Sequence, residues 1–224
     1  MSASIIVSYD GTANDDDALA LARAFASAGA KLALAYVRHS REFDPRREEL
    51  AHHDAERRLE HGATGLGDPD LPRHVVVSAS TGEGLAQLAE SEGTSMIVFG
   101  SDYRTPPGRA EPGTAAQHLL EGGPVAIAVA AAGVRTMRDL AIRTIAVSGS
   151  ADSDEAAQQT AASLAEKLGA SIVDEGGDQV DLVVVGSSAS GPPDRVTLSG
   201  ADRSRLNSLR GSVLVVPRGK PVAL

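Results

Sequence analysis

The sequence predicts an α/β fold with a doubly wound parallel sheet, present in two tandem copies of which the second is shorter. Three observations support this prediction: a core of small aliphatic residues, strictly alternating strand and helix patterns, and two internal matches. Hydrophobic residues make up 42% of the 224 residues, aromatic residues only 3%, and tryptophan is absent. Valine, isoleucine, leucine and alanine are the usual filling of parallel sheets that helices cover.

The first three elements follow from short local patterns. An apolar run at 4–9 predicts a strand, and a second apolar run predicts another at 31–37. Between them, the helix expected at 15–29 begins with three consecutive aspartates, at 15–17, which the positive end of a helix dipole favours. We interpret these aspartates as a helix cap, the alternative being a functional acidic cluster.

The remaining elements of the first copy continue the alternation. The expected order is an amphipathic helix at 46–62, a valine-rich strand at 74–79, a helix at 83–92, a strand at 95–100, a helix at 114–121 and a strand at 124–129. Such alternation predicts parallel strands joined by right-handed crossovers. Residues 130–139 break the strand pattern with a glycine and charged residues, which predicts a linker.

The chain also matches itself, which reveals architecture that local patterns do not. Residues 6–8 resemble residues 146–148 at an offset of 140, whereas residues 98–101 resemble residues 184–187 at an offset of 86. The difference means that the second copy lacks about 54 residues, which correspond to one helix–strand–helix unit. The predicted domains are a complete one at 1–132 and a truncated one at 140–224.

Composition excludes several classes of function. The formal net charge of -9 repels a polyanion, and the basic residues within 46–58 are interleaved with glutamates, so nucleic acid is not an expected partner. Because cysteine is absent, thiol catalysis and thiolate metal sites are ruled out. No apolar run approaches the roughly 18 residues that cross a bilayer, and no secretory signal opens the chain. We therefore expect a cytoplasmic protein without a membrane partner.

Loops that follow strands are the places to look for a binding site, because ligands of open α/β sheets bind beyond the carboxyl ends of the strands. After the first strand, the Asp10 carboxylate is suited to accept hydrogen bonds from ribose or adenine, the alternative being a turn that caps the next helix. After the fourth strand, the loop from Gly100 to Gly113 leads into a helix at Thr114. Glycines and a helix start let backbone N–H groups approach phosphate oxygens. The alternative is a loop that only closes the sheet edge.

This loop resembles the signature of the universal stress protein family, in which Gly is followed by two residues, Gly, nine residues, Gly and then Ser or Thr. The chain has Gly100, Tyr103, Gly113 and Thr114 at this spacing, so Tyr103 replaces the second glycine. The resemblance covers nearly all of the first copy and, in shortened form, the second. It implies a fold like that of the adenine nucleotide alpha hydrolases.

The resemblance further implies a binding or regulatory protein that holds ATP or a related adenine nucleotide, together with Mg²⁺, in the first copy. The implied cofactor-binding residues are Asp10, Val37, Gly100, Gly113 and Thr114, the first two beside the nucleobase and ribose. Tyr103 puts a ring where ATP-binding members of the family have bare backbone. The competing hypothesis is therefore a nucleotide-free stress-response scaffold, which a Tyr103 side chain in the phosphate position would favour.

In the second copy the corresponding site positions are altered. Ser150 stands for Asp10, Ala189 for the second glycine and Ser199 for the third, so nucleotide binding is not expected there. Members of the family commonly pair through their fifth strands. The resemblance thus implies that the strands at 124–129 and 212–216 pair within the chain, as an internal dimer. A homodimer of two chains stays open.

No catalytic group and no metal site are expected. His52, His53 and His61 lie on one predicted helix among charged residues, which favours a solvated face over a metal site. Ser78 and Ser80 lack the Gly-x-Ser-x-Gly context of a nucleophile elbow. At most, slow hydrolysis of ATP by water is expected. A third hypothesis, an enzyme of the adenine-hydrolase superfamily, lacks an acid or base that we can place.

Overall fold

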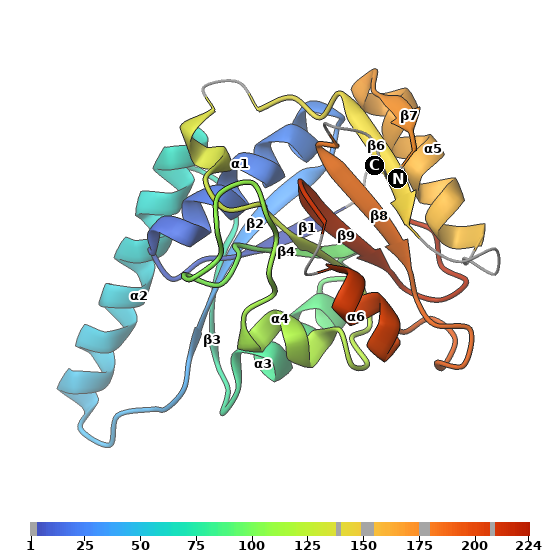
Figure 1. Cartoon of the computed structure of the whole chain (residues 1–224). Coiled ribbons are helices and arrows are strands. Elements are labelled where there is room, and N and C mark those ends of the chain that lie inside the picture. The colour runs from blue at the N-terminus through green and yellow to red at the C-terminus, as the bar shows by residue number, and fades with distance from the viewer. Residues whose placement is uncertain (1–3, 138–139, 149–154, 175–179, 207–208) are drawn as a thin grey trace.

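The computed structural model describes residues 4–137, 140–148, 155–174, 180–206 and 209–224. These residues form one mostly parallel sheet of nine strands with helices on both faces (Figure 1). The strands are β1 (Ser4–Ser8), β2 (Lys31–Arg38), β3 (Arg73–Val77), β4 (Met96–Phe99), β5 (Ala126–Val129), β6 (Thr144–Ser148), β7 (Ser171–Val173), β8 (Leu182–Gly186) and β9 (Ser212–Val216). The helices are α1 (Ala13–Ser27), α2 (Pro45–Leu66), α3 (Thr81–Ser91), α4 (Thr114–Leu119), α5 (Glu155–Leu168), α6 (Gly200–Leu206) and the short 3-10 helix η1 (Val134–Thr136). The α/β fold and the doubly wound parallel sheet are confirmed.

The sheet consists of two parallel halves joined by one antiparallel pair. Its strand order is β3-β2-β1-β4-β5-β9-β8-β6-β7, and only β5 and β9 run antiparallel, with Ile127 opposite Val215. The predicted pairing of the strands at 124–129 and 212–216 is therefore confirmed. Outward from this junction the first half (4–137) is ordered β5-β4-β1-β2-β3 and the second half (140–224) β9-β8-β6-β7. Between β7 and β8 the described residues contain no helix or strand.

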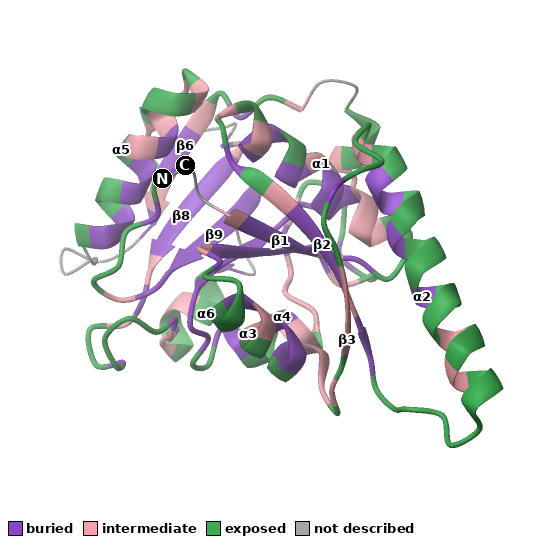
Figure 2. Ribbon diagram, turned by 180° about the vertical axis from the view of Figure 1, so that it is seen from behind, coloured by how far each residue is buried: buried purple, intermediate pink, exposed green. Residues whose placement is uncertain are grey.

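Two hydrophobic clusters lie on opposite faces of this sheet. Side chains alternate along each strand, so Ile5 and Val7 pack on the face covered by α1, α2 and α5, while Ile6 packs on the other face. Helices α3, α4 and α6 lie on that second face, as Figure 2 shows with the buried strands between the two helical layers. The sheet is covered on both faces, as the aliphatic composition predicts.

Helix α1 begins two residues before the predicted start, and the aspartate run at 15–17 has two roles. The Asp15 carboxylate accepts hydrogen bonds from the Thr12 N–H at 3.1 Å and from the Thr12 hydroxyl at 2.9 Å, so the interpretation as a helix cap is confirmed for Asp15. Asp17 is instead fully buried. Its carboxylate accepts hydrogen bonds from the Gly133 N–H at 3.0 Å and the Arg135 N–H at 2.8 Å.

The segment expected to be a linker is thus fixed to α1. Arg135 adds an ion pair to Asp17 with 2.6 Å between Nη1 and Oδ2. Ala130 and Ala131 at its start are buried. Residues 138 and 139 lie outside the described chain, and the domain boundary between 1–132 and 140–224 stays a prediction.

Helix α2 is longer than the predicted 46–62, because Gly62 does not end it. A Cβ at Gly62 would lie 2.9 Å from a side-chain atom of Tyr9, so this glycine permits close packing of α2 on the sheet. The helix starts at an Asp44 cap and ends at Gly67, which is left-handed with φ 79°. Its Glu48 pairs with Arg38 of β2 at 2.8 Å, and this guanidinium lowers the pKa of Glu48 to about 2.

No helix of the described chain is both long enough and apolar enough to cross a membrane.

Candidate functional site

The five predicted site residues lie at one edge of the first half of the sheet. Asp10 follows β1, Val37 is near the end of β2, and Gly100 follows β4. Gly113 and Thr114 begin α4. Because β1, β2 and β4 are parallel, their carboxyl ends share this edge, where ligands of doubly wound sheets bind.

The turn that carries Asp10 is built around the Asp15 carboxylate. Asp15 Oδ2 accepts hydrogen bonds from the Asp10 N–H at 2.9 Å and the Thr12 N–H at 3.1 Å. Asp10 Oδ1 itself accepts from the Thr12 N–H at 3.0 Å. From the other side, Arg58 of α2 donates to the Asp10 carbonyl at 2.9 Å. The Asp10 side chain is exposed on a turn that two helices hold in place.

Several carboxylates make this turn acidic. Burial, followed by the neighbouring Asp10 carboxylate, raises the pKa of Asp15 to about 7. Burial and the carboxylates of Asp16, Asp15 and Asp10 raise the pKa of Tyr9 to about 12. Concentrated negative charge disfavours a phosphate at this point. It suits hydroxyl and amino donors, such as those of ribose and adenine.

Gly100 is required for packing between β4 and α1. A Cβ there would lie 2.0 Å from the Asn14 carbonyl oxygen, far closer than atoms can approach. The Asn14 side chain donates to the carbonyl of Ser101 at 2.9 Å, which ties the start of the loop to the same turn of α1. Asp10 and Gly100 are thus brought together on either side of the first turn of α1. A ligand contact at Gly100 stays a prediction.

The loop from Gly100 to Gly113 bonds mainly to itself. The Asp102 N–H donates to Glu111 O at 2.8 Å, and the Thr105 N–H donates to Asp102 O at 2.9 Å. The Glu111 N–H donates to the Ser101 hydroxyl at 3.2 Å. These N–H groups do not converge on a ligand, in contrast to a phosphate-binding loop.

Tyr103 is exposed and contacts its neighbour Arg104. Its side chain is 72% exposed, and its hydroxyl accepts a hydrogen bond from Arg104 Nε at 2.7 Å. The Arg104 guanidinium lies 4.9 Å from the ring centroid. The start of α4 is open, because a Cβ built at Gly113 meets no atom within 4 Å.

Val37 and the start of α4 share α3 as a neighbour. A Cβ at Gly84 of α3 would lie 3.2 Å from Val37 Cγ1, and the Val37 side chain is buried beneath this helix. Gly113 has φ -70°, a Cβ added to it would meet no atom within 4 Å, and Thr114 is exposed. The predicted residues therefore form two groups, Asp10 with Gly100 beside α1 and the other three beside α3.

In the second half the equivalent helix start is closed by its own side chains. Ser199 accepts a hydrogen bond from the Asp202 N–H at 3.1 Å and donates to the Asp202 carboxylate at 2.6 Å. The Ser199 side chain therefore caps a backbone N–H in the first turn of α6. Gly113 has no side chain to cap the first turn of α4 in the same way. Ala189 is exposed, and Ser150 lies outside the described residues.

Sequence reasoning missed Arg58 and the anchoring role of Asp17. The burial of Asp17 has a sequence signal, because Leu21 and Ala24 follow it at helical spacing and both are buried. Arg58 has no such signal, since its contact with the Asp10 turn joins residues that are 48 positions apart.

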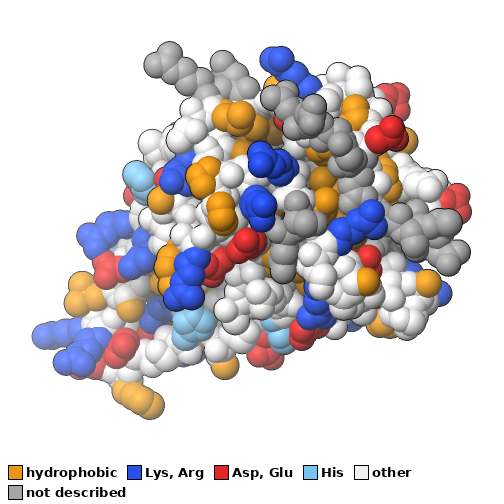
Figure 3. Space-filling view, in the orientation of Figure 1, with side chains coloured by type: hydrophobic (Ala, Val, Ile, Leu, Met, Phe, Trp, Pro, Cys, Tyr) orange, Lys and Arg blue, Asp and Glu red, His pale blue; other side chains and the backbone are white. Residues whose placement is uncertain are grey.

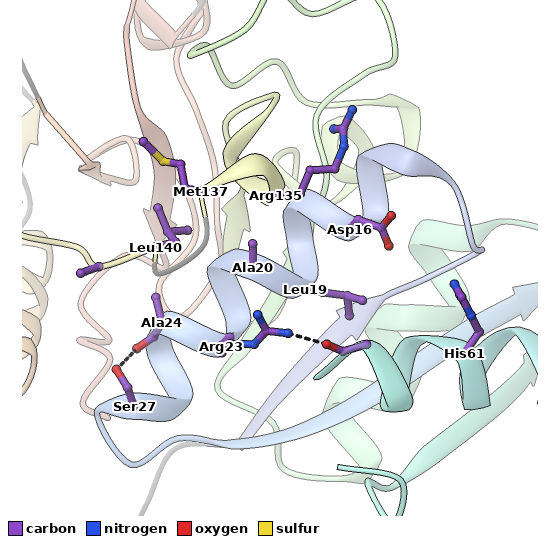
Figure 4. Close-up of a pocket in the computed structure, with 12 residues that line it drawn as sticks. Asp16, Leu19, Ala20, Arg23, Ala24, Ser27, His61, Arg135, Met137 and Leu140 are labelled. Atoms are coloured by element: carbon purple, nitrogen blue, oxygen red, sulfur yellow. Dashed lines mark hydrogen bonds between the residues drawn. The ribbon is translucent and has the colours of Figure 1, made fainter. Parts of the chain in front are cut away.

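A separate cavity of about 630 Å³ lies along the outer side of α1. Figure 4 shows Leu19 and Ala20 of α1, His61 of α2 and Met137 after η1 around it. Arg23 donates across it to the Gly65 carbonyl. None of the five predicted residues lines this cavity.

The histidines of α2 lie on a solvated face, as predicted. His52 and His53 are both exposed and face glutamates, with 3.2 Å between His52 and Glu56. Figure 3 shows basic and acidic side chains side by side over this helix. Within the described chain, no three His, Asp or Glu side chains are arranged to hold a metal ion.

The fold and this edge define a doubly wound α/β protein whose polar loops follow the strands of its first half. Residues 1–130 match the model of the Universal stress protein family. The chain belongs to that family, as the signature at Gly100 to Thr114 indicates.

Two solved structures are similar over nearly the whole chain. A universal stress protein from Archaeoglobus fulgidus DSM 4304 matches with a TM-score of 0.70 and 14% identity, covering 96% of this chain and 98% of the other. A functionally unknown protein from Pseudomonas aeruginosa PAO1 matches with a TM-score of 0.62 and 14% identity, covering 97% and 92%. At such identities the similarity is one of fold. No curated protein matches the chain.

Proposed function

We propose that this protein is a regulatory protein that binds ATP or a related adenine nucleotide at the Asp10 and Gly113 edge of its first half. Family membership supports a nucleotide-binding or regulatory role. The observation that carries the proposal is the open space at Gly113, where an added Cβ meets no atom within 4 Å while the Tyr103 ring is exposed.

The residues at this edge suit the parts of a nucleotide. The exposed Asp10 carboxylate is an acceptor for ribose hydroxyls or the adenine amino group. The exposed Thr114 hydroxyl and the start of α4 after Gly113 are donors for phosphate oxygens. Mg²⁺ would be held through the phosphates, which accords with the lack of a three-ligand cluster among the described residues.

The output of binding is conformational rather than chemical. The acidic groups near the edge, Asp10 and Asp15, are committed to the turn before α1 by hydrogen bonds. With these carboxylates engaged in the turn, hydrolysis would be limited to slow attack by water.

A nucleotide-free scaffold is the second candidate, and the self-bonded loop favours it. Six of the loop N–H groups are used within the protein, and prolines remove three more donors. In this case the loop closes the sheet edge. The second half then serves as an internal partner that covers β5 through the β5–β9 pair.

Calorimetric titration with ATP and Mg²⁺ separates the two candidates. Gly113→Val places a branched side chain at the start of α4 where nothing clashes, so it blocks the site without disturbing the fold. Asp10→Ala removes the acceptor. Gly200→Val, at the corresponding helix of the second half, is the matched control because its Cβ also meets no atom within 4 Å.

Saturable heat that is lost in Gly113→Val and Asp10→Ala, with Kd unchanged in Gly200→Val, supports nucleotide binding in the first half. We expect a weakening of about tenfold or more, which is at least about 1.4 kcal/mol. No heat and no thermal shift at saturating ATP would favour the scaffold.

A further inference from the structure

The outer edge of the first half is an unprotected strand. Among the strands of the described residues, β3 is the terminal one and pairs with β2 alone. Natural proteins protect such edges with charged residues, proline, bulges or very short strands. β3 has five residues and ends with three valines, and Val77 is 38% exposed. The opposite edge, β7, has only three residues.

The pairing with β2 shows which backbone groups remain free. The Leu34 N–H donates to Pro72 O at 2.9 Å, and the Ser78 N–H donates to Arg38 O at 3.0 Å. In a parallel ladder alternate residues bond to the neighbour, so His74 and Val76 face β2. The N–H and C=O groups of Arg73, Val75 and Val77 therefore point outward from the sheet.

A groove of about 590 Å³ runs between this edge and α2. Its floor is apolar, with Leu59, Leu71 and Val75. Figure 2 shows β3 less buried than its neighbour β2 in the sheet, with α2 alongside. An added strand would thus find backbone partners at the edge and an apolar floor for alternate side chains.

The walls of the groove carry net negative charge. Glu56 and Glu60 of α2 and Asp70 oppose a single arginine, Arg73. His52, also in the wall, is positively charged only when protonated. A partner with basic side chains is complementary to this wall, and the net charge of -9 for the whole chain favours its approach.

We propose that the free edge of β3 and the acidic groove beside it form a docking site for an extended, basic peptide segment of a partner protein. The segment adds as a tenth strand to the sheet, and its lysines or arginines pair with Glu56, Glu60 and Asp70. A second copy of this chain is disfavoured as the occupant. Pairing β3 with β3 would bring two acidic grooves together. The site is on the opposite side of the first half from the β5–β9 junction, and none of the five predicted nucleotide-site residues lines its groove.

Two variants of the full chain test the two parts of the site. Val75→Pro removes an outward N–H without breaking the β2 ladder, and Val75→Ala is its matched control because it keeps that N–H. Glu56→Lys with Glu60→Lys reverses the charge of the groove on an exposed helix face. Glu92→Lys with Glu166→Lys, both exposed and far from the groove in the sequence, is the control for net charge.

The probe is a short fluorescent peptide of alternating lysine and valine, followed by polarisation with the purified chain. We expect Val75→Pro and the groove double variant each to weaken binding about tenfold or more, while both controls bind like the unchanged chain. The same peptide with alternate N-methyl groups should also fail to bind.

Four outcomes would overturn the proposal. Three come from the peptide assay: no binding of the peptide, equal weakening in the net-charge control, or undiminished binding of the N-methylated peptide. The fourth comes from gel filtration. If the unchanged chain dimerises and Val75→Pro abolishes the dimer, the edge belongs to a second copy instead.

Discussion

Ser101 and Ser187 hold equivalent positions in the two halves of the protein. Each hydroxyl donates to a carbonyl 29 residues further along, Ser101 to Ala130 at 2.6 Å and Ser187 to Val216 at 2.7 Å. Each also accepts from an N–H ten residues later, at 3.2 Å and 3.1 Å. These paired bonds share the offset of 86 found in the sequence. They support the proposal that the second half is a shortened copy of the first.

We predict that Ser101→Ala and Ser187→Ala destabilise the protein by similar amounts. Each substitution leaves a buried carbonyl and an N–H without their partner, which costs about 1–3 kcal/mol in the free energy of unfolding. Urea unfolding followed by circular dichroism measures it. Ser190→Ala, at an exposed position of the second loop, is the control and should change little. A large cost in one half only would argue against equivalent loops.

Gly100→Ala should destabilise the protein far more than Gly113→Ala. A methyl group at Gly100 overlaps the Asn14 carbonyl oxygen at 2.0 Å, and moving α1 away from β4 costs about 2–4 kcal/mol. At Gly113 a methyl group meets open space, so we expect less than about 1 kcal/mol. Thermal unfolding compares the two. Equal effects would show that Gly100 tolerates a side chain and that its role lies elsewhere.

The sequence predicted the fold well because its signals are local or repeated. Every strand of the first half was placed within two residues, and the pairing of β5 with β9 followed from the family resemblance. The end of α2 was misplaced because Gly62, normally a helix breaker, lies where Tyr9 permits no Cβ. Such a contact depends on the packed structure and has no local signal.

The candidate site was less predictable for the same physical reason. The residue types at Asp10 and Gly113 pointed to loops that lie at the carboxyl ends of the parallel strands, and ligand binding there stays a prediction. Whether the ring of Tyr103 turns inward or outward depends on its contact with Arg104 and on the bonds that close the loop. The spacing of residues in the sequence carries no information on this contact or on these hydrogen bonds.

The contribution of Asp15 to the stability of the protein should fall as the pH rises from about 4 to about 7. Burial and Asp10 raise the pKa of Asp15 to about 7 in the folded state, whereas the pKa of an aspartate in the unfolded chain stays near its ordinary value of 3.8. The folded state therefore holds a proton that the unfolded state releases, and this contribution is present at low pH and lost as the pH rises through about 7.

Asp15→Asn tests this origin of the pH dependence. The amide keeps an oxygen that can accept from the Asp10 and Thr12 N–H groups but does not ionise. We expect the Tm of Asp15→Asn to rise relative to that of the unchanged chain as the pH increases from about 4 to about 7. Above about pH 7 the difference in Tm should stay constant. A difference in Tm that does not change with pH would contradict this origin. Asp202→Asn, in the cap of α6, is the control.

Asp17 should matter more for stability than an exposed ion pair of similar length. Its carboxylate is fully buried and holds two backbone N–H groups and Arg135, whereas the Glu121–Arg203 pair, at 2.8 Å, has both side chains about half exposed. Asp17→Ala should cost about 3 kcal/mol, and Glu121→Ala less than about 1 kcal/mol.

Proteolysis distinguishes a local from a global effect of Asp17→Ala. Since Asp17 fixes the segment around η1 to α1, we expect its loss to expose the chain near Arg135 to trypsin before the rest unfolds. Faster cleavage there with little change in the urea midpoint would show that Asp17 secures only this segment. Faster cleavage together with a lower urea midpoint would show that the connection between the two halves is part of one cooperative fold.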